Sequence, residues 1–388
     1  MRTALVSALI LSSSCGAIDE GPVRQHHALV GGAEAGPEQL AVVKLTIGCT
    51  GTVLAPNLVL TARHCVAALP AGAFYCDENG GPVDGGGEVP HYGATIDPTT
   101  IMIEANGSST NPRLPNASTS PRGSMILVPA ETNRCKTDVA LIVLDPPIDD
   151  PVIAPVQLEA VPTVGATLTA VGWGLSEVAG PLTAPRQRDV SVIAIGPRAG
   201  ATPDDAVWDH FFTVSEGLCY GDSGSPGRSA SGAVVGVASF INFTAAPTSM
   251  ASDCESAGIS GGYAALANEK AFITQGFATA NATPWLDGQP NPRDALAPFE
   301  GACTTDADCQ SNACVAHACT HGCANVVTST PCPAGYTCEF LDDRQRCVQS
   351  VAPDAGTDQT PPEPTGCSSA PVALLWLGVL ALRTRARH

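Results

Sequence analysis

Three short segments of the chain hold a histidine, an aspartate and a serine, in that order. His64 precedes a cysteine, Asp138 opens the apolar run 138–144, and Ser223 lies in Gly-Asp-Ser-Gly-Ser-Pro at 221–226. A serine hydroxyl is a weak nucleophile until an imidazole accepts its proton, and the imidazole needs a carboxylate that fixes its tautomer and stabilises its charged form. The three residues could therefore act together in nucleophilic acyl transfer.

The amino-acid composition limits the classes of protein that could hold these three residues. The 388 residues include 39 Gly and 33 Pro, with only 14% charged and 5% aromatic residues, which favours an all-β, loop-rich protein over a helical bundle. The formal net charge of −18 argues against nucleic-acid binding. Sixteen cysteines indicate an oxidising compartment.

Short apolar runs rich in β-branched residues predict the strands. Turn residues separate them, and many short strands of this kind form a sandwich or a barrel, between which the pattern does not choose. Segment 77–123 is rich in Gly, Pro, Asn and Ser and is interpreted as surface loops, and residues 268–273 are expected to begin a helix with Asn268 as its cap. The predicted strands are 41–47, 58–61, 125–128, 139–144, 167–171, 190–195 and 233–240.

The three frames and their order resemble the chymotrypsin/trypsin family of serine endopeptidases. Leu-Val-Gly-Gly at 29–32, the segment 48–56 and Gly-Trp-Gly at 172–174 match further landmarks, so the resemblance extends over 29–273. It implies two packed six-stranded antiparallel barrels of the trypsin-like type, with the site in the cleft between them. It implies no metal and no organic cofactor.

The resemblance gives each residue of the site a role. His64 would be the general base and then the general acid, Asp138 would orient it, and Ser223 would form the acyl-enzyme. The backbone N–H groups of Gly221 and Ser223 would form the oxyanion hole. Cleavage before Leu29 would free an ammonium group that pairs with Asp222, so the protein would be made as a zymogen.

Specificity follows from the same alignment. Gly217 would form the pocket base, where an enzyme specific for basic residues would need an acid. Ser239, Phe240 and Ile241 would bind the substrate backbone and line the pocket, and the branched Ile241 would narrow it. We therefore expect cleavage after small or medium apolar residues.

The cysteines fall into two groups. In the family alignment Cys49 pairs with Cys65 and Cys219 with Cys254, and parity suggests a third bridge between Cys76 and Cys135. Eight further cysteines lie in 303–350 together with His317 and His321, but no Cys-x-x-Cys pair occurs, so four disulfides are favoured over a zinc site. This small disulfide-rich module follows the protease region 29–287 and a linker at 288–302, and acts as a spacer or a binding module.

Both ends of the chain resemble processing signals. Residues 1–28 indicate a signal peptide and propeptide, and Cys15 is either a lipidation site or incidental. Residues 351–366 form a Pro-, Thr- and acid-rich stalk. Residues 367–388 resemble the C-terminal sorting tails of myxobacterial surface proteins. Their apolar run 370–382 covers roughly 20 Å as a helix, less than the ~30 Å of a bilayer core, so a processed signal is favoured over an uncleaved anchor.

Together these features predict a secreted or cell-surface bacterial serine endopeptidase. Its partners would be protein or peptide substrates, with membrane association only through processed termini, and it would be a monomer. The alternative is a non-catalytic binding protein on the same scaffold, with the cysteine-rich module as its recognition part; an esterase that spares peptides is a third option. Covalent labelling of the serine would distinguish the endopeptidase from the binding protein, and digestion of peptides would distinguish it from the esterase.

Overall fold

The computed structural model describes residues 29, 32–70, 76–83, 88–104, 121–174, 184–200, 206–215, 217–242, 254, 259–323, 332–342 and 344–350. The described residues up to Gln349 belong to one compact unit. The predictions for residues 1–28 with Cys15, for the stalk from Val351 and for the tail 367–388 concern segments outside the described residues. None of the helices in the described ranges is long and apolar enough to cross a membrane.

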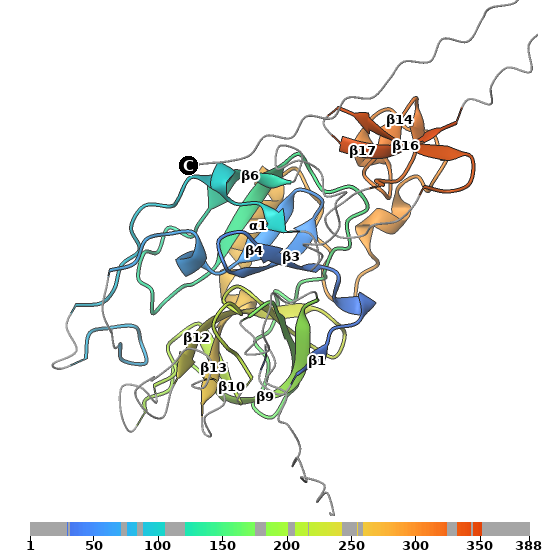
Figure 1. Ribbon diagram of the computed structural model, residues 1–388. Coiled ribbons are helices and arrows are strands. Elements are labelled where there is room, and N and C mark those ends of the chain that lie inside the picture. The colour runs from blue at the N-terminus through green and yellow to red at the C-terminus, as the bar shows by residue number, and fades with distance from the viewer. Residues whose placement is uncertain are drawn as a thin grey trace, which may run out of the picture. The chain divides into compact units, whose positions relative to one another are not determined.

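Two β-structures follow one another along the chain (Figure 1). The first is an open sheet that curves as a half-barrel, with the strand order β5-β2-β3-β4-β7-β6. An isolated bridge between Met102 and Arg122 links its two edges. Its strands are β2 (Val42–Leu45), β3 (Thr50–Ala55), β4 (Leu58–Thr61), β5 (Ile103–Glu104), β6 (Arg122–Leu127) and β7 (Ala140–Asp145).

The second β-structure is a closed six-stranded barrel with one added strand. Its order is β1-β9-β10-β13-β12-β11-β8, and an additional pairing of β8 with β9 closes the ring. The strands are β1 (Ala33–Glu34), β8 (Thr167–Gly172), β9 (Arg186–Ile195), β10 (Phe211–Val214), β11 (Pro226–Arg228), β12 (Val234–Asn242) and β13 (Ser260–Ala265). The all-β class and the two-barrel architecture expected from the sequence are therefore confirmed, with the first barrel left half open.

A shared core holds the two halves together. Leu58 and Leu141 of the half-barrel belong to the same buried cluster as Phe211 and Val237 of the closed barrel. Trp173, just after β8, donates its indole N–H to the carbonyl of Val42 at 3.1 Å, and so joins the first residue of β2 to the second barrel. Burial of this apolar surface supplies the main favourable term that fixes one half against the other.

Two sequence interpretations need correction. Segment 77–123 was expected to form surface loops, but Ile101 and Ile103 are buried in the first barrel and β5 pairs with β2. Helix α1 (Lys270–Thr279) begins after a 3-10 turn over Leu266–Glu269, and no side chain caps it, so Asn268 is not its cap. The alternation of Ile101 and Ile103 is too short to stand out against the turn residues around it.

The cysteine-rich segment folds as two small hairpins. These are β14 (Cys314–Val315) with β15 (Ala318–Cys319), and β16 (Tyr336–Leu341) with β17 (Arg344–Gln349). Residues 288–302, expected to be a linker, include the 3-10 helix η7 (Pro292–Ala295). Four disulfides cross-link the segment: Cys303–Cys314, Cys309–Cys319, Cys323–Cys338 and Cys332–Cys347.

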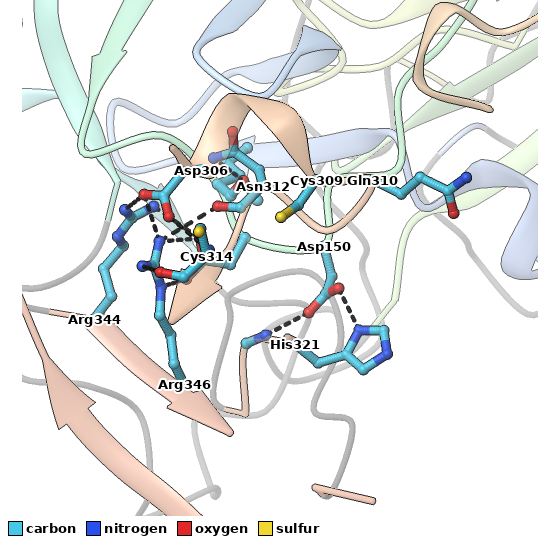
Figure 2. A network of polar contacts seen from close by, with 12 residues as sticks. Asp150, Asp306, Cys309, Gln310, Asn312, Cys314, His321, Arg344 and Arg346 are labelled. Atoms are coloured by element: carbon cyan, nitrogen blue, oxygen red, sulfur yellow. Dashed lines mark hydrogen bonds and ion pairs between the residues drawn. The ribbon is translucent and has the colours of Figure 1, made fainter. Parts of the chain in front are cut away.

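Ionic contacts join this segment to the loop after β7. The ring of His321 lies 2.7 Å from one oxygen of Asp150, and the amide of Gly322 donates to the other at 2.6 Å (Figure 2). Arg346, which is 2% exposed, contacts both Asp149 and Asp306. The segment is therefore held against the first barrel by these polar and charged contacts, whereas its four disulfides lie within the segment itself.

Candidate active site

His64 and Asp138 are joined by two hydrogen bonds. His64 lies in the 3-10 turn Arg63–Cys65 that follows β4, and Asp138 lies just before β7, which pairs with β4. The ring Nδ1 of His64 is 2.8 Å from Oδ2 of Asp138, and the backbone N–H of His64 donates to Oδ1 at 2.9 Å. The carboxylate can therefore fix the ring orientation, which leaves Nε2 to exchange protons elsewhere.

Ser223 shares a pocket with His64. The pocket has a volume of about 300 Å³ and is lined by residues of the turn before β11 and of strand β12. Both Ser223 and His64 are partly exposed, whereas Asp138 is fully buried. A substrate in this pocket would therefore lie against both the serine and the histidine. The lining residues are His64, Leu218, Cys219, Tyr220, Asp222, Ser223, Ala238, Ser239, Phe240 and Ile241.

The turn around Ser223 presents two backbone amides. Gly221 has a φ of +91°, a conformation that side chains rarely adopt. In the part of the chain that the structure describes, the N–H groups of Gly221 and Ser223 have no hydrogen-bond partner, whereas those of Asp222 and Gly224 donate to Cys219 and Ala238. These two amides are therefore available to stabilise an oxyanion.

Thr50 holds this turn from the first barrel. Its hydroxyl donates to the carbonyl of Gly221 at 2.9 Å and accepts from the amide of Trp173 at 3.1 Å. Its own amide donates to the carbonyl of Ser223 at 2.8 Å. A single buried residue thus contacts both residues of the turn whose amides have no partner among the described residues.

Asp222 is fully buried behind the serine. Its carboxylate accepts hydrogen bonds from the amides of Gly174 and Cys219, each at 2.9 Å, and from the amide of Leu29. Burial raises the pKa of Asp222 to about 7, although these amides favour its charged form. Leu29 is itself 0% exposed, so the expected mature N-terminus lies inside the protein next to its expected partner.

Two residues that the sequence analysis did not single out contact Asp138. The hydroxyl of Tyr92 donates to Oδ1 at 2.5 Å, and Nη2 of Arg134 lies 3.2 Å from Oδ2. Burial would raise the pKa of Asp138, but Arg134, His64 and Tyr92 together hold it below its usual range. Asp138 therefore stays ionised while fully buried. The only feature of the sequence that could have indicated these contacts is the position of Arg134, four residues before Asp138.

The pocket wall differs in part from the expectation. Ser239, Phe240 and Ile241 line it, as does Leu218, whereas Gly217 is not among the lining residues. The Leu218 side chain packs so closely on β13 that a Cβ at Gly261 would lie 2.6 Å from its Cδ1. Leu218 therefore contributes the bulk that the sequence analysis attributed to Ile241 alone.

Disulfides brace the loops around the pocket. The structure forms Cys49–Cys65 beside His64, Cys219–Cys254 beside the serine turn, and Cys76–Cys135 beside Arg134. These are the three pairs that were expected. Within the described residues, all cysteines of the clusters with metal-ligand spacing are disulfide-bonded, and a disulfide sulfur is not a thiolate ligand.

Part of the chain matches a known protein family. Residues 100–254 match the model of the trypsin family, described as Trypsin. A solved structure, a mutant of human heparin binding protein (CAP37), is 19% identical, covers 67% of this chain and 100% of its own, and superposes with a TM-score of 0.43. No curated protein matches the chain. The trypsin match and the barrel topology together support a chymotrypsin/trypsin-type fold.

Proposed function

We propose that this protein is a serine endopeptidase that cleaves peptide bonds through an acyl-enzyme on Ser223. The observation that carries the proposal is the 2.8 Å contact of His64 Nδ1 with the buried carboxylate of Asp138, in a pocket that also exposes Ser223. That pairing leaves the second ring nitrogen of His64 free to accept a proton from a nucleophile.

Each step of the reaction falls to a residue of the pocket. His64 takes the proton of the Ser223 hydroxyl as the oxygen attacks the scissile carbonyl, and then gives that proton to the leaving amine. The amides of Gly221 and Ser223 stabilise the charge on the carbonyl oxygen. Water attacks the acyl-enzyme in the second half-reaction, with His64 again as the base. The ionised Asp138 stabilises the imidazolium at each stage.

The proposed substrates carry a small or medium apolar residue before the cleaved bond. Leu218, Phe240 and Ile241 supply the apolar wall of a pocket of about 300 Å³. Arg134, the buried cation nearest to the pocket, is held by Asp138 and by the carbonyl of Ser239. Asp222, the acid that lines the pocket, already accepts hydrogen bonds from three backbone amides, so a charged substrate side chain would lose more hydration than it gains in contacts.

We further propose that the protein is exported as a zymogen and is retained at the bacterial surface or released from it. Fourteen cysteines in seven disulfides support an oxidising compartment, where such bridges persist. The burial of Leu29 against Asp222 supports activation by cleavage before Leu29. Deleting residues 366–388 should shift the protein from the cell envelope to the medium, and retention of the deleted chain in the envelope would contradict the role of the tail.

Labelling with a fluorophosphonate tests the proposed chemistry. The matured protein should be labelled at Ser223, and Ser223→Ala should abolish labelling and lower turnover by about 10⁶-fold. Digestion of a diverse peptide pool, read by mass spectrometry, then gives the cleavage sites. Labelling of Ser223 without peptide cleavage would indicate an esterase. The absence of both labelling and cleavage would indicate the non-catalytic binding protein.

A further inference from the structure

Arg134 is a buried arginine in direct contact with the carboxylate that orients His64. Its side chain is 4% exposed, and its Nη2 lies 3.2 Å from Oδ2 of Asp138, the same oxygen that His64 Nδ1 contacts at 2.8 Å. The guanidinium and the imidazole therefore share one carboxylate oxygen. A cation at this distance must alter how strongly Asp138 holds the protonated ring of His64.

The same nitrogen also contacts the strand that lines the pocket. Nη2 of Arg134 donates to the carbonyl of Ser239 on β12 at 3.0 Å, and the guanidinium carbon lies 5.9 Å from the centroid of the Trp208 ring. Asp138 precedes a strand of the first barrel, and Ser239 belongs to the second. Arg134 thus bridges the acid of one barrel to the pocket wall of the other.

The local backbone fixes Arg134 in this place. Its amide donates to the carbonyl of Pro90 at 2.9 Å, and the side-chain amide of Asn133 donates to the carbonyl of Gly80 at 2.7 Å. Cys135 forms a disulfide with Cys76. The turn is therefore tied on both sides of Arg134, and the long side chain loses little further freedom when it reaches Asp138.

We propose that Arg134 is a positioning residue that sets the pH at which the His64–Asp138 pair becomes active and that aligns β12 with it. The proposal rests on the proposed function of this pocket. The positive charge opposes protonation of His64, because it offsets part of the negative charge of Asp138. The acid limb of the pH–activity profile should therefore lie at a lower pH than it would with an uncompensated carboxylate.

The other charged and titratable groups around Asp138 do not supply this effect. Tyr92 contacts Oδ1 as a neutral hydroxyl, and burial, followed by the charge of Asp138, raises its pKa well above the usual value. Arg63 faces the Tyr92 ring at 4.5 Å and donates to the carbonyl of Pro129, so it acts on Asp138 only at longer range. Arg134 is the cation in contact with the carboxylate among the described residues.

The test is the pH dependence of kcat/KM in matched arginine variants of the matured, full-length protein. Arg134→Met should move the acid limb to higher pH by about two pH units, the size expected for a unit charge about 6 Å away at an effective dielectric constant near 20. Arg134→Lys should return the limb towards the wild-type position, because the charge is restored. Arg228→Met is the control, since Arg228 is also buried but binds the carbonyls of Gly232 and Glu38 away from Asp138.

The outcomes separate this proposal from the function on which it rests. Failure of fluorophosphonate to label the wild type rejects the serine endopeptidase itself. Normal labelling with the same acid limb in Arg134→Met and Arg228→Met rejects the role of Arg134. If the Met variant does not fold, Arg134→Gln repeats the test with a neutral hydrogen-bond donor. A limb that moves to higher pH in Arg134→Gln but not in Arg134→Lys supports the role of the charge, whereas a limb that lies at the same pH in both variants rejects it.

Discussion

The backbone amide of Leu29 donates to the carboxylate of Asp222, inside the protein and directly behind the serine turn. The same carboxylate holds the amides of Cys219 and Gly174. Asp222 thus connects three segments: the residues before Ser223, the Gly-Trp-Gly segment that ends at Gly174, and the expected new N-terminus. Whether its partner is a neutral amide or an ammonium group decides how costly its charge is in this buried place.

The first prediction concerns the stability of the uncleaved chain. Burial raises the pKa of Asp222 to about 7, from 3.8 for an ordinary aspartate. Between these values the folded chain keeps a proton that the unfolded chain has lost, so the stabilisation is complete below pH 3.8 and disappears as the pH rises through about 7. The free energy of unfolding of uncleaved Ser223→Ala should therefore fall by roughly 1 to 4 kcal/mol over this range because of Asp222 alone.

Urea unfolding at a series of pH values measures this contribution. The double variant Ser223→Ala, Asp222→Asn is the control, because it lacks the titrating group and keeps the pH dependence that comes from the other acids. The difference between the two curves of unfolding free energy against pH is the contribution of Asp222. Identical pH slopes in the two chains would show that Asp222 does not titrate in this window.

The second prediction concerns activation. Because the proposed cleavage follows Ala28 and the pocket is proposed to accept small apolar residues, the protein should activate itself in trans. Ala28→Arg should block self-activation, and added trypsin should restore activity through the same Leu29 ammonium. Asp222→Asn should leave the cleaved protein nearly inactive, since the buried ammonium loses its partner. Edman sequencing of the active form reads the result, and a mature N-terminus elsewhere together with an active Asp222→Asn would reject the scheme.

Strands with long apolar, β-branched runs were predictable, whereas β13 was not. β7 and β9 were found within a few residues, because their apolar residues suffice to identify buried strands. β13, Ser260–Ala265, contains two glycines and was missed. Those glycines are a consequence of tertiary packing: a Cβ at Gly262 would lie 2.2 Å from Cζ of Phe240. No local pattern carries that information.

The same distinction applies to the candidate site. His64, Asp138 and Ser223 lie in distinctive local frames, so the sequence was enough to propose them. Tyr92 reaches Asp138 from 46 residues earlier in the chain, within a segment interpreted as surface loops. Thr50 acts through side-chain contacts to a turn 171 residues later. Contacts of this length depend on the way the barrels pack, which the sequence alone does not specify.

The third prediction concerns Thr50, the residue that holds the turn of Gly221. Thr50→Val keeps the shape but leaves the buried carbonyl of Gly221 without its donor, which costs about 1–3 kcal/mol. If about 1.4 kcal/mol of this is lost in the transition state, kcat falls about 10-fold with little change in KM. Thr50→Ser should recover most of the loss.

Thr52 provides a matched control two residues further along β3. It is 0% exposed, and its hydroxyl has no hydrogen-bond partner in the described part of the chain. Thr52→Val should therefore leave kcat unchanged and should not lower stability. Steady-state kinetics on one peptide substrate measures all three variants. Equal kcat values for Thr50→Val and Thr52→Val would exclude the positioning role of Thr50.

The fourth prediction concerns specificity. Leu218 lines the pocket, and Leu218→Ala should enlarge it. The ratio of kcat/KM for substrates with Phe and with Ala before the cleaved bond should rise at least about 10-fold. Leu168→Ala is the control, because Leu168 is equally buried in the same apolar cluster but does not line the pocket. It should lower stability without changing the ratio, and a ratio that changes equally in both variants would remove Leu218 from the specificity pocket.

The fifth prediction concerns the attachment of the cysteine-rich segment. Arg346 contacts Asp149 and Asp306 while almost completely buried, and burial raises the pKa of Asp149 to about 6 even though Arg344 and Arg346 oppose the shift (Figure 2). Removing one partner of such a pair leaves the other charge uncompensated, at a cost of about 3–5 kcal/mol. Arg346→Met should therefore be strongly destabilising at pH 7. Adding Asp149→Asn should recover a large part of the loss, because it removes the charge that was left.

Denaturant unfolding of the two single variants and the double variant gives the coupling between Arg346 and Asp149. Arg344→Met serves as the comparison, since the Arg344 side chain is 12% exposed against 2% for Arg346 and water can replace part of its contact. Hydrogen exchange should show faster exchange at the amides of Gly322 and Cys347 in Arg346→Met, while those of β7 keep their protection. Additive losses in the double variant would mean that the two residues stabilise the protein independently, which would contradict the proposed coupling.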